Sequence, residues 1–154
     1  MKIEHATFDK LDEITALYRH LFQMMANLQP DYWQAVEPQR EFLAHMLNKE
    51  SSAIFVALNE QKKVTGFILC QEQETPPYPC YIPHRFAYIL DLVVDENTRG
   101  QGIGSALIDS VIKWAKQRKL DYVDLNVLAE NNQAVKLYTK HGFVKNSLIL
   151  RKKI

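Results

Sequence analysis

The sequence predicts a single α/β domain, in which helices flank both faces of a mixed, mostly antiparallel central sheet. Three observations favour this class. The chain has 154 residues, 47% of them hydrophobic, which is enough for one core and too little for two. Short apolar runs typical of strands alternate with segments of helical periodicity. No internal repeat or low-complexity segment divides the chain, so residues 1–154 are expected to form one domain.

The N-terminal third predicts one strand and two helices. Residues 2–6 have the composition of a short opening strand, and residues 11–25 place their apolar side chains on one helical face. A break over 27–38 contains Pro30 and Pro38 and precedes a shorter amphipathic helix over 42–47.

The middle of the chain predicts three strands. Apolar runs over 53–58 and 64–70 are joined by a polar turn and read as a strand–turn–strand unit. Residues 75–83 contain four prolines and cannot lie inside a sheet. A third central strand is expected over 86–94.

The C-terminal third predicts a crossover and a final helix and strand. A helix over 104–116 lies between the strand ending at Val94 and an alternating strand over 122–128, an order typical of a parallel crossover. Asn131 or Asn132 is placed to cap a last helix, which Gly142 ends. Residues 148–150 are expected to close the chain as a strand.

Charge and cysteine content exclude several function classes. The formal net charge is +1 with interleaved signs, so no nucleic-acid partner is expected. The longest apolar stretch, 88–94, is interrupted by Asp91 and is too short to span a bilayer, so no membrane partner is expected. Cys70 and Cys80 lack the spacing of a metal or redox site, which predicts no metal and a reducing cytoplasmic location.

A glycine-rich turn between a strand and a helix is the strongest chemical signal. It comprises Arg99, Gly100, Gln101, Gly102, Ile103, Gly104 and Ser105. Such a turn presents unpaired N–H groups at the positive end of the helix, where a pyrophosphate binds well, and Arg99 adds a charge-assisted contact. The alternative is a glycine-rich connection without a ligand. The turn lacks the Gly-Lys-Ser/Thr of a P-loop, and its glycine spacing departs from the dinucleotide-binding fingerprint.

A second motif completes the interpretation. Residues 131–143 have the spacing N-x-x-A-x-x-L-Y-x-x-x-G-F, and they follow R-x-x-G-x-G at 99–104. Together, the two motifs resemble the GCN5-related N-acetyltransferase (GNAT) family. The resemblance is specific over residues 86–143 and implies transfer of an acetyl group from acetyl-CoA, as co-substrate, to a primary amine.

The resemblance also implies roles for individual residues. The backbone of Leu92, Val93 and Val94 pairs with the pantetheine arm, and the glycine-rich turn holds the pyrophosphate. Asn131 contacts the cofactor arm, and Tyr138 lies near the thioester sulfur. A phenol of reference pKa ~10 can protonate a departing thiolate without ionising at rest. The alternative for Tyr138 is a core aromatic on a helix face.

Asp91 is the candidate base, because a carboxylate in an apolar strand costs stability unless something uses it. Several family members carry Glu-Asp at this point, whereas this chain has Leu90-Asp91. The alternative is that Asp91 bonds backbone N–H groups at a bulge. Tyr88 is another group that can relay a proton through water.

The acceptor is expected beside residues 27–39 or beside the proline-rich residues 75–85. Asp31, Tyr32 and Trp33 are candidates for an aromatic and acidic pocket that binds a cationic amine, and an ordinary surface loop is the alternative. The acceptor itself stays open between a small-molecule amine and a peptide or protein N-terminus. The rival from another class is a non-catalytic acyl-CoA-binding or sensing domain of the same fold.

The segment after Gly142 has twelve residues, too few for the two full strands with which many family members end. A strand over 148–150 would have an unpaired outer edge. Pairing with a second subunit predicts a homodimer, because two-fold dimers are the commonest closed assembly. The competing hypothesis is a monomer whose edge is guarded by Arg151, Lys152 and Lys153.

Overall fold

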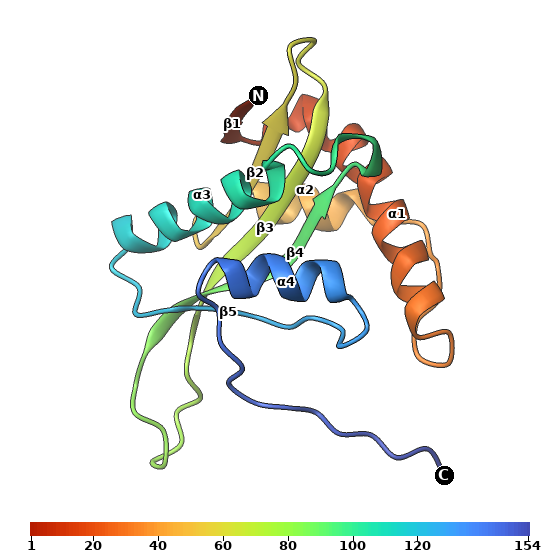
Figure 1. The fold of residues 1–154 in the computed structure, drawn as a ribbon. Helices are drawn as coiled ribbons and strands as arrows, with labels where there is room; N and C mark the ends of the chain where they lie inside the picture. Colours follow the sequence, from red (N-terminus) through yellow and green to blue (C-terminus); the bar gives the residue numbers. More distant parts are fainter.

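The structure is a computed structural model that describes residues 1–154, and it contains one five-stranded sheet with four α-helices (Figure 1). In chain order the elements are β1 (Lys2–His5), η1 (Phe8–Lys10), α1 (Leu11–Leu28), α2 (Arg40–Asn48), β2 (Ser52–Leu58), β3 (Val64–Glu74), β4 (Arg85–Val94), η2 (Glu96–Thr98), α3 (Ile103–Gln117), β5 (Val123–Leu125) and α4 (Asn132–Lys140). η1 and η2 are short 3₁₀ turns.

The sheet is mixed and mostly antiparallel, as predicted. Its strand order is β1-β2-β3-β4-β5, and the first three pairings are antiparallel. β5 pairs with β4 in parallel, so α3 forms the expected crossover between them. The proline-rich residues 75–83 form the loop between β3 and β4, where no ladder hydrogen bond is needed.

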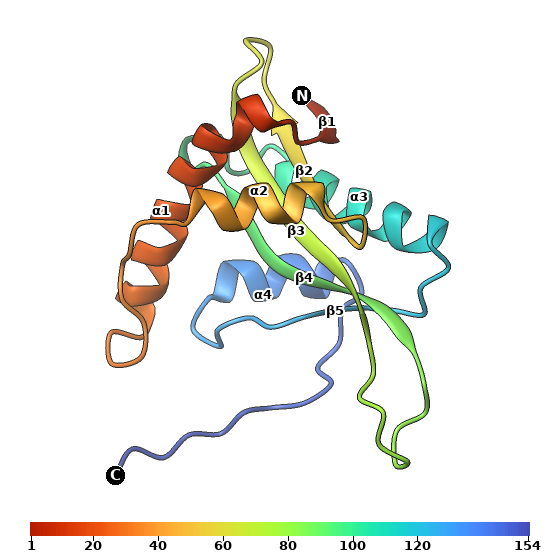
Figure 2. The same ribbon diagram turned by 180° about the vertical axis from the view of Figure 1, so that it is seen from behind.

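Helices cover both faces of the sheet, and each face has its own core. α1 and α2 pack on one face (Figure 2), where Leu11, Ile14 and Leu43 meet Phe67 of β3. α3 and α4 pack on the other (Figure 1), where Leu107 and the neighbouring apolar residues of α3 meet the alternate side chains of the same strands. Coverage on both sides explains why every residue of β2 is buried. No helix is long and apolar enough to cross a membrane.

β5 is much shorter than the strand predicted over 122–128. Only Val123–Leu125 pairs with β4, opposite Ala87–Ile89. After Ile89, β4 bulges and diverges from β5, so residues 126–128 have no strand to pair with and continue as a loop.

The predicted strand over 148–150 is wrong for the single chain. Leu148, Ile149 and Leu150 are 71%, 85% and 89% exposed, and no strand follows α4. The segment instead runs away from the sheet (Figure 1) toward the loop after α1. There the Arg151 guanidinium stacks 4.1 Å from the ring centre of Tyr32, and the Lys153 Nζ lies 2.8 Å from Asp31 Oδ2. A strand needs an edge to pair with, and this path offers none.

Candidate active site

The site is organised by the point where β4 and β5 separate. The two strands are paired only as far as Ile89 and Leu125, so β4 from Leu90 to Val94 has a free edge on that side. The Asp95 N–H donates to the Thr65 carbonyl of β3, at 2.8 Å. Because N–H groups alternate in direction along an antiparallel ladder, those of Leu92 and Val94 point away from β3 toward the open edge. An extended ligand can therefore pair with this edge.

A β-bulge at Leu90 sets the direction of Asp91. β3 pairs Leu69 with Asp91 and Cys70 with Ile89, which leaves Leu90 as the extra residue. Leu90 packs against the core under α1 and α2. The Asp91 carboxylate lies on the same face, where its Oδ2 accepts a hydrogen bond from the Tyr18 hydroxyl of α1 at 2.5 Å. The bulge thus turns two consecutive side chains toward α1.

Asp91 is a perturbed carboxyl group. Burial raises its pKa to about 6, while the hydrogen bond from Tyr18 opposes that shift. A carboxyl group with this pKa is mostly ionised at neutral pH and can still accept and release a proton near it. Burial and the neighbouring Asp91 charge together raise the pKa of Tyr18 far above its usual value, so Tyr18 remains a hydrogen-bond donor.

The glycine-rich turn has the conformation and the space that a pyrophosphate requires. Gly100 and Gly102 have φ of +80° and +79°, where a side chain is strained. A Cβ added to either would meet no heavy atom within 4 Å, so the turn is open on its outer side. Gly104 differs, because its Cβ would lie 2.9 Å from Leu137 Cδ2. It therefore permits the close approach of α3 to α4.

The first turn of α3 offers unpaired donors. Gly102 is the N-cap, and the first hydrogen bond of the helix runs from the Ala106 N–H to the Gly102 carbonyl. Ile103, Gly104 and Ser105 precede it, and their N–H groups have no partner inside the helix. Arg99 is exposed and has no acidic partner. These groups together suit a ligand with several negative charges.

α4 brings Asn131 and Tyr138 to the opposite side of the open edge. The Asn131 Oδ1 accepts the Ala134 N–H at 3.2 Å, which confirms the predicted cap and leaves the side-chain amide donors free. Tyr138 packs edge-on against Phe143, with 5.7 Å between ring centres, and its hydroxyl makes no hydrogen bond to another residue. Burial and the Asp91 charge raise the pKa of Tyr138 to about 12, so it is protonated at rest.

A cavity of about 100 Å³ lies beside Asp91 on the other face of the sheet. Its walls come from α1, α2 and the segment between them, and they are mostly apolar. The lining residues are Tyr18, Phe22, Pro38, Gln39, Phe42, Leu43 and Asp91. The Asp91 carboxylate is therefore accessible to a compact ligand group that binds between α1 and α2.

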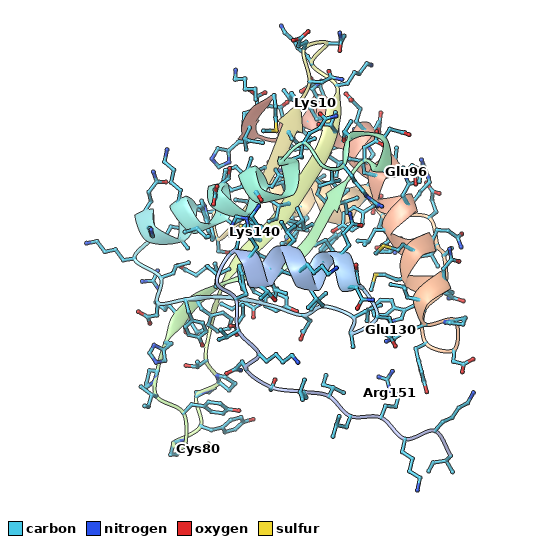
Figure 3. All side chains as sticks on the ribbon, viewed as in Figure 1. Lys10, Cys80, Glu96, Glu130, Lys140 and Arg151 are labelled. Atoms are coloured by element: carbon cyan, nitrogen blue, oxygen red, sulfur yellow. The ribbon has the colours of Figure 1, made fainter.

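The remaining predicted residues lie apart from this cavity. Asp31 forms an ion pair with Lys153, and the Tyr32 ring stacks with Arg151, both from the C-terminal segment. Trp33 is 42% exposed. None of the three lines the cavity. Tyr88 lies on β4 before the bulge, where its hydroxyl accepts a hydrogen bond from the Asn126 amide at 2.7 Å. The loop before α4 also reaches the end of α1, where Glu130 accepts a hydrogen bond from Gln29 at 3.0 Å (Figure 3).

Sequence reasoning missed the residues that α1 and α2 contribute. Tyr18 and Phe22 lie in the amphipathic segment 11–25, and they do pack on its apolar face, since Tyr18 contacts the rings of Phe22 and Phe67. The available signal was the phenol hydroxyl on that face, which needs a partner when buried. Its partner, Asp91, was the one carboxylate in a buried strand, 73 residues later.

Comparisons with known proteins agree with this arrangement. The sequence model of the acetyltransferase (GNAT) family matches residues 14–143. An uncharacterized N-acetyltransferase of Methanocaldococcus jannaschii is 30% identical over 148 residues, which cover 96% of this chain and 62% of that protein. N-alpha-acetyltransferase 30 of Saccharomyces cerevisiae is 29% identical over 104 residues, which cover 61% of this chain and 59% of that protein. The matched regions thus span less than two thirds of either relative.

The fold is also similar to solved structures. A tetramutant of the BH1408 protein from Bacillus halodurans superposes with a TM-score of 0.95 at 24% identity, over 100% of both chains. The family match extends over most of the chain and includes the open edge of β4, the glycine-rich turn and α4. The chain therefore belongs to the GNAT family.

Proposed function

We propose that the chain transfers the acetyl group of acetyl-CoA to a primary amine, by direct attack of the amine within a ternary complex. One observation carries the proposal: beside the free edge of β4, Asp91 is hydrogen-bonded to Tyr18 of α1, and its charge raises the pKa of Tyr138 on α4. We therefore assign Asp91 as the proton acceptor and Tyr138 as the proton donor of the reaction.

Acetyl-CoA is expected to bind across the α4 side of the sheet. Its pyrophosphate would take the N–H groups of the open turn at Gly100 to Gly104, with Arg99 adding charge. Its pantetheine arm would pair with the free edge at Leu92 and Val94, as the backbone alternation allows. Asn131 has free amide donors at the start of α4 for the same arm.

The reaction then needs one proton removed and one supplied. The neutral amine nitrogen attacks the thioester carbonyl, and the N–H groups of the β4 edge stabilise the oxyanion. The new C–N bond forms as the C–S bond breaks, Asp91 accepts the nitrogen's proton, and Tyr138 donates its own to the thiolate. The products are an acetamide and free CoA, and solvent returns both groups to their starting protonation states.

The Asp91 base suits an amine of moderate basicity. At neutral pH an α-amine near pKa ~7.8 needs about 1 kcal/mol to lose its proton, whereas a lysine-like amine of pKa ~10.4 needs about 4.6 kcal/mol. A single carboxylate with a pKa of about 6 is a weak base for the second. The yeast relative, named an N-alpha-acetyltransferase, agrees with acetylation of the less basic class of amine.

Release of free CoA tests the proposal. The protein should release CoA from acetyl-CoA when a suitable primary amine is present and should release little without one. Binding of acetyl-CoA with no release for any amine in a broad panel would favour the alternative, a non-catalytic acyl-CoA-binding domain. The apolar Leu90, at the position where several family members carry glutamate, is the observation that keeps this alternative open.

We also infer a homodimer whose interface includes residues 148–152. Leu148, Ile149 and Leu150 are consecutive apolar residues that the single chain leaves exposed, and covering them with a second copy would remove that surface from water. Light scattering at micromolar concentration tests this inference. A mass that stays near the 17.9 kDa of one chain at all concentrations would contradict it.

A further inference from the structure

The cavity beside Asp91 has properties that select among amines. It holds about 100 Å³, and its walls include the rings of Tyr18, Phe22 and Phe42. An apolar cavity of about 150 Å³ in another protein admits benzene, so a smaller cavity that is open to solvent on one side suits at most one ring or one compact aliphatic group. We infer that the acceptor is a small primary amine that carries a single aromatic or compact apolar group. This inference rests on the proposed acetyl transfer.

The charges around the cavity disfavour a polycationic acceptor. Asp91 is the only carboxylate in its lining. Of the five carboxylates between Leu11 and Asn48, four already have basic partners within the chain, and Glu41 alone has none. The four pairs are Glu13 with Lys10, Glu37 with Arg19, Asp12 with Arg40, and Asp31 with Lys153. A polyamine or an aminoglycoside would find two carboxylates without a basic partner here, Asp91 and Glu41, for several ammonium groups.

The inner end of the cavity defines where the amine lies. Tyr18 packs with its ring centre 5.4 Å from that of Phe22 and 4.8 Å from that of Phe67, which leaves its ring little freedom. Its hydroxyl holds the Asp91 carboxylate at 2.5 Å, immediately before the free N–H of Leu92. An amine whose apolar group fills the cavity therefore presents its nitrogen between Asp91 and the edge of β4. Tyr18 acts as a positioning residue in this arrangement.

A panel of amines tests the inference. With saturating acetyl-CoA, kcat/KM referred to the concentration of neutral amine should be at least tenfold higher for 2-phenylethylamine than for spermidine, kanamycin or a peptide with a free N-terminal glycine, because only the first fills the cavity. A higher kcat/KM for spermidine or kanamycin would overturn the inference while leaving acetyl transfer intact. Faster acetylation of the peptide would likewise overturn it and assign a polypeptide acceptor.

Variants locate the selectivity in the cavity. Phe42→Ala should lower kcat/KM for 2-phenylethylamine about tenfold and leave the small amount of spermidine acetylation unchanged. Phe8→Ala is the matched control, because Phe8 is a similarly exposed aromatic (49% against 42%) that does not line the cavity. Equal losses for both amines in Phe42→Ala, or an equal loss of 2-phenylethylamine activity in Phe8→Ala, would contradict the assignment.

A binding measurement separates this inference from the proposed reaction. If no amine releases CoA, the proposed reaction is wrong. Calorimetry of 2-phenylethylamine with the protein–CoA complex then tests whether the cavity binds an apolar amine. Binding that Phe42→Ala weakens would support the cavity as a site for apolar amines. No detectable binding at millimolar amine would overturn the inference.

Discussion

The two faces of the sheet differ in how their parts of the site are built. On the α3 and α4 face, the turn at 99–105 and the helix at 132–140 contribute backbone donors and one phenol from short, continuous segments. On the α1 and α2 face, the cavity is assembled by side chains from both helices, the intervening segment and Asp91. The first half of the site depends on local backbone geometry, whereas the second depends on long-range packing.

This difference has a functional meaning. Acetyl-CoA is common to the whole family, so a fixed backbone arrangement serves every member. The acceptor varies, and side chains on two helices can change without disturbing the turn that we propose binds the pyrophosphate. β4 is shared by both halves, because its bulge turns Asp91 to one face while its free edge serves the other.

Tyr138→Phe should have the largest effect. The substitution keeps the ring and its contact with Phe143 but removes the proton that the thiolate requires. We expect kcat to fall about 10²–10⁴-fold, with little change in the affinity for acetyl-CoA, because that is the usual contribution of general acid–base catalysis. Stopped-flow acetyl transfer and equilibrium binding measure the two quantities separately. A fall of less than about threefold, with chemistry rate-limiting, would make Tyr138 a packing residue.

Asp91→Asn should slow the reaction and stabilise the fold. The native carboxyl has a pKa of about 6, against 3.8 for an unperturbed aspartate, so the native state binds the proton more tightly than the unfolded state. Wild-type stability therefore falls relative to the variant as pH rises through this interval. The difference should be near zero below about pH 4 and reach about 3 kcal/mol above pH 6, from the shift of about two pKa units.

Two measurements check the Asp91 prediction. Urea unfolding at pH 4 and pH 7 measures the difference in stability between wild type and Asp91→Asn. The pH profile of kcat/KM measures the difference in their catalytic rates. The wild-type profile should show an acid limb with an apparent pKa near 6, which the variant should lack. A variant that is less stable than wild type at pH 7 would mean that the carboxylate is a structural anchor of the bulge.

Gly102→Val should weaken acetyl-CoA binding about tenfold or more. A valine at φ +79° is strained, and relaxation of the turn would misplace the N–H groups at the start of α3. The rise in melting temperature that saturating acetyl-CoA produces should then disappear, since that rise reflects binding to the native state. Gly142→Val is the matched control, because Gly142 has a similar φ of +85° and equally open space but lies after α4, outside the turn, so the melting shift should be retained. An unchanged shift in Gly102→Val would remove the pyrophosphate from this turn.

Tyr18→Phe should give the smallest effect and one that depends on pH. The Tyr18 hydrogen bond lowers the pKa of Asp91 against the effect of burial, so its loss should raise that pKa further. The acid limb of kcat/KM should move to higher pH, with a loss of several-fold at pH 6 and little change at pH 8.5. Tyr78→Phe, an exposed site 64% accessible, is the matched control. A pH-independent loss would show that Tyr18 only supports packing.

The same contrast explains what the sequence could predict. The order of elements, the parallel crossover, the Asn131 cap and the glycine-rich turn follow from periodicity and from residues whose backbone preferences are strong. The Tyr18–Asp91 bond and the aromatic cavity could not be predicted, because they join residues 73 positions apart that a sequence shows only as apolar or polar. The strand expected at 148–150 does not form because the segment leaves the outer edge of β5 unpaired and runs to the loop after α1, where Arg151 contacts Tyr32 and Lys153 contacts Asp31.

Initial-velocity kinetics test the central claim most directly, since the claim is direct transfer at a centre that both faces complete. Rates would be measured over a grid of acetyl-CoA and amine concentrations, using the amine of the panel that releases CoA fastest. A ternary complex predicts double-reciprocal lines that intersect. Parallel lines, together with a burst of CoA release before any amine is added, would indicate an acetylated enzyme and would contradict direct attack.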